Sequence, residues 1–448
     1  MIERGRCPFL ILLVVCFLSS CSSVGRCNDY ESFFISKLSG KESAYPESKQ
    51  LKTKRIAQER NKIWKAWVRA NQHVEEESLV GLTQLTTSSR GSWTLPKELE
   101  PNAIMPYYYG YIGSKPQAGF PFFLYLHGSG PKDPEWATGL KLATEVFPDT
   151  SLVYFIPQIP NEGEYYRWYQ RSKQFAWNKL FRRVLLDENI DPDRLYLFGI
   201  SEGGYGSQRL ASFYADYLAA AGPMAGGEPL KNAPAENCRK IGFSLLTGEL
   251  DRGFYRNILT NYTRAAYDSL ENIYPGDFKH RIQLIPKCGH GIDYRPTVPW
   301  LKTFRRNPWP KAFSWEDFEM DGQHRQGFYN IVVEERPDAD KRTRYDVEIN
   351  DNSIDITVRT VQYKVVEKDS IWGIELKFNR EYQMAENGKF TVYLNEKLVD
   401  LSRPVRLTVN GRLVHDGELV CTTTHMLNSL LVFADPQRIY PAAISVTL

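Results

Sequence analysis

The chain lacks the features that mark several large classes of protein. Its 56 Lys and Arg residues nearly balance 53 Asp and Glu residues, and the formal net charge is only +3. This gives no electrostatic case for binding nucleic acid. No CxxC pair and no His/Cys spacing typical of a metal site occurs, so neither a metal nor another cofactor is expected. The absence of internal repeats and low-complexity segments excludes solenoid architectures.

Long hydrophobic runs are also scarce, and the one that stands out lies at the N-terminus. Arg4 and Arg6 precede FLILLVVCFL (residues 9–18), which has the pattern of a secretory signal and is too short to span a membrane stably. The run ends in L-S-S-C, whose last residue, Cys21, resembles the cysteine of a bacterial lipobox. This resemblance implies export, acyl chains on Cys21 and a lipid anchor in the bacterial envelope, at the outer membrane. An ordinary signal peptide with a chance cysteine is the alternative.

Few cysteines remain once such a signal is removed. An exported protein could pair Cys27, Cys238, Cys288 and Cys421. Cys238 precedes an expected strand at 240–247, whereas Cys288 follows an expected strand at 280–286. In a parallel sheet these are opposite ends, roughly 20 Å apart at ~3.3 Å per residue. We therefore expect this pair to be unbridged.

The middle of the chain alternates between strand and helix patterns. Near-continuous apolar runs indicate strands buried on both faces, as in a parallel sheet, and helical segments between them predict an α/β fold. The expected strands are 105–113, 120–128, 151–158, 193–201, 240–248 and 280–286. The expected helices are 137–146, 175–189, 207–220 and 254–272.

The two flanking segments have different patterns. Apolar positions in residues 47–76, including Trp64 and Trp67, follow helical spacing and predict one amphipathic helix docked by tryptophans. After about residue 320, polar and apolar residues alternate, and we expect only strands. The Asn410-Gly411 pair there is a strong hairpin signal. A small β-sandwich without a concentrated set of catalytic residue types is predicted.

The stretch FGISEGGYG (198–206) surrounds Ser201 with glycines. Within it, G-I-S-E-G matches the nucleophile-elbow pattern, in which a serine sits on a sharp strand-to-helix turn. Gly199 and Gly203 flank Ser201 because a Cβ there would collide with the neighbouring strand or helix. Ser201 also follows an expected strand and precedes an expected helix, as an elbow requires.

Three further segments complete a hydrolytic constellation. LHGSG (126–130) follows an earlier strand, where backbone N–H groups can face a developing oxyanion. We expect the oxyanion hole to comprise the N–H of Glu202 plus one from Gly128 or Ser129. Asp251 and His290 each follow an expected strand, at the carboxyl edge where open α/β sheets build sites.

The order Ser, Asp, His matches that of the hydrolases. His290 is expected to take the proton of Ser201, and Asp251 to hold the imidazole tautomer. Glu249 is the alternative acid, although we expect it to be a rim carboxylate or a partner of Arg252.

The stretch ENIDPDRLYLFGISEGGYGSQRLA (188–211) resembles the α/β-hydrolase esterases of the polyhydroxybutyrate depolymerase and feruloyl or acetylxylan esterase type. In these, an IDP-x-R segment leads the strand into G-x-S-x-G-G. The resemblance covers roughly residues 95–300. It implies a secreted serine carboxylesterase that hydrolyses esters, with acetyl or feruloyl esters linked to polysaccharide as substrates. The oxyanion loop departs from the pattern at Ser129 and at the prolines that follow.

Two other interpretations remain open. S-E-G-G-Y also resembles the core of prolyl-oligopeptidase-type serine peptidases, but those carry a propeller or long β-domain first, and here fewer than 100 residues precede the catalytic segment. The other is a non-catalytic carbohydrate-binding lipoprotein on a hydrolase scaffold.

Aromatic residues in the segment 157–177 are candidates for substrate binding. The segment lies between an expected strand and helix, where a loop can cover the site. Tyr166 and Trp168 are predicted to stack on sugar or aromatic acyl groups, and packing within the loop is the alternative. His127 is expected to shape the oxyanion loop, and the side chain of Glu202 to point to solvent.

The predicted organisation has four segments. They are a lipoprotein signal (1–20), a tether with the amphipathic helix (21–94), an α/β-hydrolase catalytic domain with a mainly parallel sheet (95–318) and a β-sandwich accessory domain (319–448).

The lipid anchor can be tested at Cys21. We expect Cys21→Ala in the full-length precursor to move the protein from membranes to the soluble fraction, since the acyl chains are the predicted anchor. Cys27→Ala is the matched control and should leave the protein with the membranes. Cell fractionation measures both, and mass spectrometry that found no acyl group on the native N-terminus would refute the lipobox interpretation.

Overall fold

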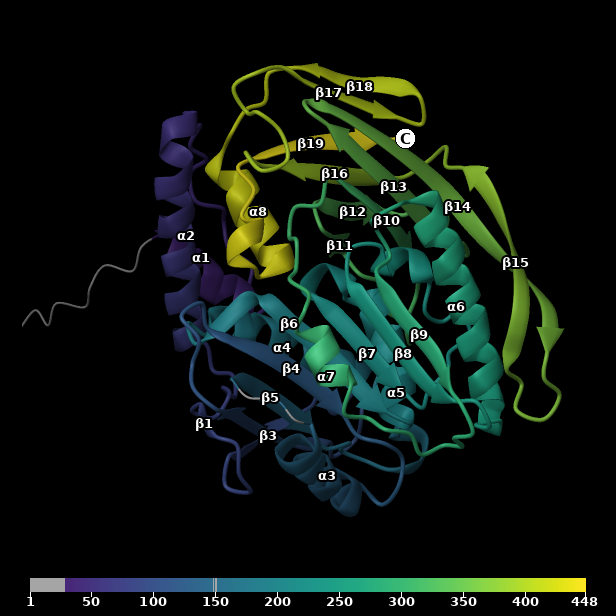
Figure 1. The fold of residues 1–448 in the computed structure, drawn as a ribbon. Helices are drawn as coiled ribbons and strands as arrows, with labels where there is room; N and C mark the ends of the chain where they lie inside the picture. Colours follow the sequence, from purple (N-terminus) through teal and green to yellow (C-terminus); the bar gives the residue numbers. More distant parts are fainter. Residues whose placement is uncertain (1–28, 148, 150) are drawn as a thin grey trace, which may run out of the picture.

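The computed structural model describes residues 29–147, 149 and 151–448. The expected signal, Cys21 and Cys27 lie outside the described residues. The chain forms an α/β part and a β-rich part stacked above it in Figure 1. Across the described stretches, no helix has the length and apolar character needed to cross a membrane.

The α/β part is built on a nine-stranded sheet. Its order is β1-β3-β5-β4-β6-β7-β8-β9, with β2 paired to β3. β3 is antiparallel to β2 and β5, and neighbours from β5 to β9 are parallel. The strands are β1 Thr83–Gln84, β2 Arg90–Thr94, β3 Ile104–Ile112, β4 Phe120–Leu126, β5 Leu152–Pro157, β6 Ile190–Ile200, β7 Ala220–Met224, β8 Gly242–Gly248 and β9 His280–Ile285. The α/β fold with a mainly parallel sheet that the sequence predicted is thus confirmed.

Helices connect these strands close to the expected places. They are α3 Lys132–Lys141, α4 Arg171–Leu186, α5 Glu202–Phe213 and α6 Arg256–Ile273. A short helix after β9, α7 (Thr297–Leu301), was not expected. α5 begins at Glu202, five residues before the expected start at 207, because the glycine-rich stretch after Ser201 is itself helical. β7 was not expected, since its sequence AAGPM contains both glycine and proline.

Alternate residues of the central strands belong to two separate cores, one on each face of the sheet. In β4, Phe122 and Leu124 belong to one buried cluster, whereas Phe123 and Tyr125 belong to the other. Every residue of β4 is buried. Burial on both faces is what the continuous apolar runs predicted.

The β-rich part contains two sheets. The larger runs β10-β13-β14-β17-β18, with β15 paired to β14, and the smaller runs β11-β12-β16-β19. Their strands are β10 Ala312–Asp317, β11 Gly327–Phe328, β12 Ile331–Glu335, β13 Arg342–Asn350, β14 Ser353–Lys368, β15 Glu375–Met384, β16 Lys389–Leu394, β17 Val405–Val409, β18 Arg412–Gly417 and β19 Ala442–Thr447. Trp315 of β10 stacks on Phe328 of β11, so side chains of the two sheets meet face to face.

Two expectations for this part were wrong. β10 pairs with β13, so residues 312–317 belong to the β-rich part and not to the catalytic segment 95–318. A helix, α8 (Thr423–Phe433), also interrupts the strands, and the Thr422 side chain caps it by accepting the N–H of His425. The hairpin at Asn410-Gly411 is confirmed between β17 and β18, with φ of 49° and 76°.

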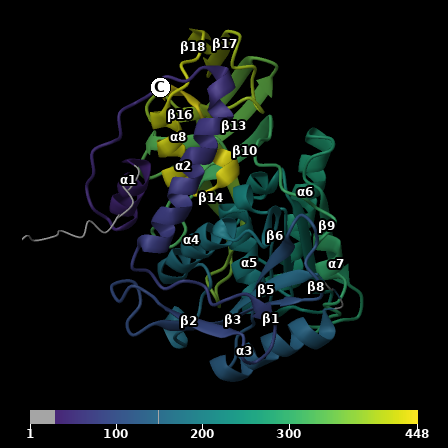
Figure 2. The ribbon, with the colours of Figure 1, turned by 90° about the vertical axis from the view of Figure 1, so that its left-hand side faces the viewer.

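Two N-terminal helices lie along the side of the molecule that faces the viewer in Figure 2. They are α1 (Asp29–Leu38), which was not expected, and α2 (Thr53–His73), the amphipathic helix predicted within 47–76. Trp67 of α2 is buried. Arg60 of the same helix binds Glu396 of the β-rich part at 2.7 Å, and Asn71 accepts a hydrogen bond from Arg182 of α4 at 2.5 Å. α2 therefore ties the two parts together.

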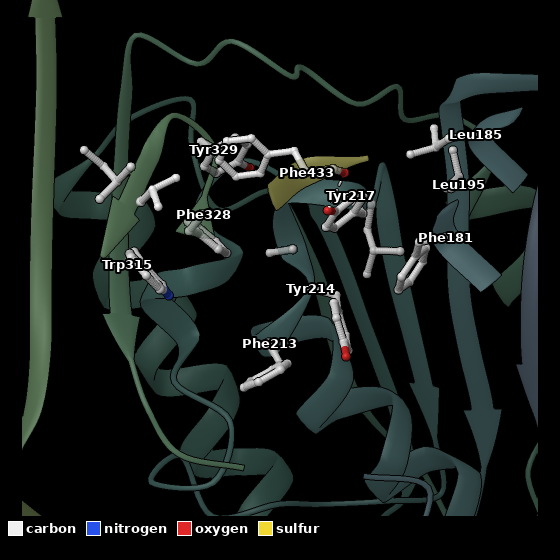
Figure 3. Close-up of a cluster of buried hydrophobic side chains, with 14 of the residues drawn as sticks. Phe181, Leu185, Leu195, Phe213, Tyr214, Tyr217, Trp315, Phe328, Tyr329 and Phe433 are labelled. Carbon is white, nitrogen blue, oxygen red and sulfur yellow. Dashed lines mark hydrogen bonds between the residues drawn. The ribbon is translucent and has the colours of Figure 1, made fainter. Parts of the chain in front are cut away.

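An aromatic cluster fills the junction between the two parts (Figure 3). Tyr217, which follows α5, stacks on Phe181 of α4, and its hydroxyl donates to the carbonyl of Phe433 in α8 at 2.7 Å. Cys238, Cys288 and Cys421 are free, so Cys238 and Cys288 are not bridged to each other, as expected.

A buried ionic network crosses the same junction. Asp216 of the α/β part accepts hydrogen bonds from Arg325 at 3.0 and 3.1 Å and from Arg438 at 2.5 Å. Arg438 also donates to Asp435 at 2.8 Å, as does Arg306. The side chains of Asp216, Arg438 and Asp435 are 0% exposed, so each charge relies on the others for compensation.

Removing one member of this network should destabilise the whole molecule. Asp216→Ala is expected to lower the free energy of unfolding by roughly 3–5 kcal/mol, because it leaves buried arginine charge uncompensated. Substitution of the exposed Asp416 by alanine should change it by less than about 0.5 kcal/mol. Denaturant unfolding measures both, and equal stabilities of the two variants would contradict a structural role for the network.

Candidate active site

Ser201 stands at the turn between β6 and α5. Its backbone has φ 57° and ψ −112°, a conformation that non-glycine residues rarely adopt and that is found preferentially at functional sites. Its N–H donates to the carbonyl of Met224 in β7 at 3.0 Å. A Cβ on Gly199 would lie 2.3 Å from the Gly203 oxygen, and one on Gly203 only 2.0 Å from the Leu126 oxygen. The flanking glycines are therefore required by close backbone approach.

His290 and Asp251 come to Ser201 from the ends of two neighbouring strands. The His290 Nε2 atom lies 3.0 Å from the Ser201 Oγ, and its Nδ1 lies 2.7 Å from Asp251 Oδ2. The Asp251 side chain is almost fully buried, whereas that of His290 is 45% exposed. The structure thus brings together the three residues that the sequence singled out.

Arg256, which the sequence analysis did not identify, holds the carboxylate of Asp251. Its Nε donates to Asp251 Oδ2 at 2.8 Å and its NH2 group to Oδ1 at 2.5 Å. Burial raises the pKa of Asp251, but hydrogen bonds from Arg256 and His290 outweigh this, so the net pKa is lowered. The acid therefore stays ionised and fixed in orientation.

Glu249, the alternative acid, lies elsewhere. It is exposed, and its Oε2 accepts the backbone N–H of Lys287 at 3.0 Å. Glu249 is a rim carboxylate, as expected, and its hydrogen-bond partner is the N–H of Lys287 and not the side chain of Arg252.

The predicted oxyanion loop lies directly beside the nucleophile. A Cβ built on Gly128 would be 3.4 Å from the Cβ of Ser201. The N–H of Glu202 lies at the start of α5, where amides have no intrahelical acceptor. Both segments of the expected oxyanion hole are thus next to Ser201, with the choice between the N–H of Gly128 and of Ser129 still open.

His127 shapes this loop as a neutral imidazole. Its Nε2 accepts the N–H of Ile159 at 3.2 Å, so its Nδ1–H donates to the carbonyl of Gly128 at 2.8 Å. Burial lowers the pKa of His127 to about 4. Such a ring stays uncharged at neutral pH and serves the backbone of the loop.

The prediction that Tyr166 and Trp168 stack on substrate was wrong. Trp168 is 0% exposed and donates from Nε1 to the carbonyl of His127 at 3.0 Å. The Tyr166 hydroxyl is buried, 3.0 Å from the carbonyl of Gly128, and accepts the N–H of Gly130 at 3.3 Å. Both side chains hold the backbone of residues 127–130 by hydrogen bonds, and their burial closes them to a ligand.

The side chain of Glu202 was expected to point to solvent, which was also wrong. The residue is 7% exposed and lies 3.3 Å from Arg167. Burial raises its pKa to about 7, although Arg167 opposes this.

Among the residues that the structure describes, no group of His, Cys, Asp and Glu side chains could hold a metal ion.

Comparisons with known proteins give similarity at the level of structure. No protein-family model and no curated sequence matches the chain. A thermostable esterase is similar at 21% identity and a TM-score of 0.37, over 49% of this chain and 64% of the other. A ferulic acid esterase from the anaerobic fungus Anaeromyces mucronatus is 13% identical, with a TM-score of 0.35, over 51% and 94%.

A protein assigned as a dipeptidyl aminopeptidase IV, from Bacteroides ovatus, is 12% identical, with a TM-score of 0.36, over 48% of this chain and 34% of the other. Because these TM-scores are low, the similarities do not assign an activity to this chain.

The assignment of the acid can be tested by the reactivity of Ser201. Asp251→Asn should slow its labelling by a fluorophosphonate by about 10³–10⁴-fold, because an amide at this position no longer holds the correct imidazole tautomer. Glu249→Gln should slow it less than about tenfold, since this side chain does not reach His290. Labelling rates of the purified, folded variants decide between them, and the reverse ranking would assign the acid to Glu249.

Proposed function

We propose that the protein is an exported serine carboxylesterase that hydrolyses esters through an acyl-enzyme. The observation that carries this proposal is the continuous hydrogen-bonded relay from Asp251 through His290 to Ser201, at distances of 2.7 and 3.0 Å. A serine hydroxyl is a weak nucleophile at neutral pH and needs such a base beside it.

In the first step Ser201 Oγ attacks the ester carbonyl carbon, and its proton passes to His290 Nε2. The imidazolium that forms has its Nδ1–H directed at Asp251, whose negative charge stabilises it. Arg256 holds that carboxylate by two hydrogen bonds, so Asp251 keeps its position while the charge on His290 changes.

The carbonyl oxygen becomes an oxyanion as Ser201 bonds to the carbon. The N–H of Glu202 and one N–H of the 128–129 loop would receive it, and each such donor is worth roughly 3 kcal/mol. Collapse of this intermediate breaks the bond to the alcohol oxygen, which leaves with the proton from His290. Water then attacks the acyl-enzyme by the same steps, and His290 again takes and returns one proton.

The proposed substrates are acetyl or feruloyl esters linked to carbohydrate. This part of the proposal is supported by the resemblance of residues 188–211 to esterases that act on such compounds. The proposed location is the bacterial envelope, with Cys21 as the lipid-bearing residue.

Replacement of Ser201 tests the proposal directly. Ser201→Ala should reduce the turnover of p-nitrophenyl acetate by about 10⁴–10⁶-fold, because the members of a triad act as a unit. The exposed Ser88 is a control position, and Ser88→Ala should match the parent protein. Circular dichroism would verify that both variants are folded.

A substrate panel tests the chemistry of the reaction. Acetyl, feruloyl and methyl esters, free and linked to polysaccharide, should be hydrolysed faster than matched peptide amides. Preferential cleavage of the peptides would assign the protein to the serine peptidases, and activity above a few per cent in folded Ser201→Ala would remove Ser201 from the mechanism.

A further inference from the structure

A cavity of about 400 Å³ begins at the residue that follows the nucleophile. Glu202, Tyr205 and Arg209 line it from α5, since residues spaced in this way share one face of a helix. The loop after β7 and the turn around Phe254 form other walls. Small-molecule sites typically enclose roughly 300–1,000 Å³, so the cavity has room for a ligand of modest size.

Part of its wall comes from the β-rich part. Gly373, Ile374 and Glu375 line the cavity, at the turn between β14 and β15. The pairing of β14 with β13 stops at Val361, and beyond it β14 pairs with β15 alone. The resulting hairpin, residues 362–381, descends beside α6 in Figure 1, and we call it the hairpin arm. A two-stranded ribbon is only marginally stable alone, so contacts at its tip are needed to hold it.

The α/β part supplies those contacts from a strained turn. Phe254 and Tyr255 both have left-handed backbones, with φ of 50° and 60°, which is uncommon for bulky residues. The ring of Phe254 lies 4.7 Å from that of Trp372, between centroids, and the Tyr255 hydroxyl donates to Asp369 at 2.8 Å. The turn thus directs two aromatic side chains at the tip of the hairpin arm.

The cations in and beside the cavity already have carboxylate partners. The pairs are Arg167 with Glu202 at 3.3 Å, Arg209 with Glu228 at 2.7 Å and Lys231 with Glu375 at 2.6 Å. A carboxylate ligand would have to compete with these glutamates. The hydroxyl groups of a neutral polyol can instead accept from the cations and donate to the glutamates while the pairs persist.

One buried acceptor in the wall has no partner in the described chain. Glu202 is 7% exposed, and its Oε1 atom makes no hydrogen bond. Native proteins rarely leave such an atom unsatisfied without a functional reason. Because this atom is also closed to solvent, a ligand hydroxyl would reach it only after the Glu202 side chain turns toward the cavity that the residue lines.

Exposed aromatic surface adjoins the cavity. Phe254 lines the cavity and is 44% exposed, and Trp372, whose ring packs on Phe254 and which directly precedes the lining residue Gly373, is 59% exposed. A flat apolar face beside a polar, charge-balanced cavity suits the C–H face of a sugar ring, whose edges carry hydroxyl groups. The two kinds of surface together match the two kinds of surface on a pyranose.

We propose that this cavity binds a neutral sugar unit of the ester substrate, and that the hairpin arm is part of the binding site. The inference rests on the proposed function, because Ser201 would cleave the ester carried by the bound sugar. It assigns the β-rich part a direct role in substrate recognition through Trp372 and residues 373–375.

Binding can be measured without turnover in the full mature chain carrying Ser201→Ala. The probes are neutral tetrasaccharides of xylose, glucose, mannose or galactose, with a galacturonate tetramer as the acidic comparison. At least one neutral probe should bind by calorimetry, and more tightly than the acidic one. Trp372→Ala should weaken that binding about tenfold, the loss of one stacking ring. Ile371→Ala removes an apolar side chain of a neighbouring residue that is 75% exposed and carries no aromatic ring, so it is the matched control and should leave binding unchanged.

Turnover provides a second readout. The ratio of kcat/KM for the acetylated tetrasaccharide to that for p-nitrophenyl acetate should fall about tenfold in Trp372→Ala and stay constant in Ile371→Ala. Sugar binding without any ester turnover in the parent protein would contradict the proposed function and leave the binding site standing. Ester turnover without sugar binding would overturn this inference alone, as would equal losses in both variants or tighter binding of the acidic probe.

Discussion

The close approach of α5 to the end of β4 is the constraint on which the rest of the site depends. With no side chain on Gly203, the helix backbone reaches the Leu126 carbonyl, and a Cβ there would come within 2.0 Å of it. The same approach places Gly128, two residues further along, against Ser201. The same close backbone packing therefore fixes the position of Ser201 relative to the loop at residues 127–130. Tyr166 and Trp168 donate hydrogen bonds to the carbonyls of Gly128 and His127 in this loop, so its backbone is held in a fixed orientation.

A second line of contacts connects the triad to the cavity wall. Arg256 binds Asp251 and also approaches the hydroxyl of Tyr205 at 3.4 Å. Tyr205 lines the cavity, and α5 carries both the Glu202 amide at its start, beside Ser201, and the cavity residues along one face. A ligand in the cavity would therefore contact α5, which positions Ser201, and Tyr205, which contacts the arginine that holds Asp251.

The sequence predicted the features that follow from local pattern and chain order. The elbow glycines, the strand ends that carry Asp251 and His290 and the buried parallel strands all have such patterns. Arg256 could not be identified, because only the left-handed turn at residues 254–255 brings it back to Asp251. The aromatic residues at 166 and 168 are equally suited to packing and to stacking on ligand, and only their burial distinguishes the two. α8 was missed because its apolar run has no strong helical periodicity, and the hairpin arm because long-range docking leaves no local signal.

The ionic network at Asp216 bears on the order in which the chain can fold. One of its partners, Arg325, lies 109 residues later and the other, Arg438, lies 222 residues later. Contacts of such separation form late, because the intervening chain must be closed first. When the nine-stranded sheet has been synthesised, the two arginines that bind Asp216 at the junction have therefore not yet been made. The two parts should therefore reach the native state together, and cutting between them should yield no separately stable α/β fragment.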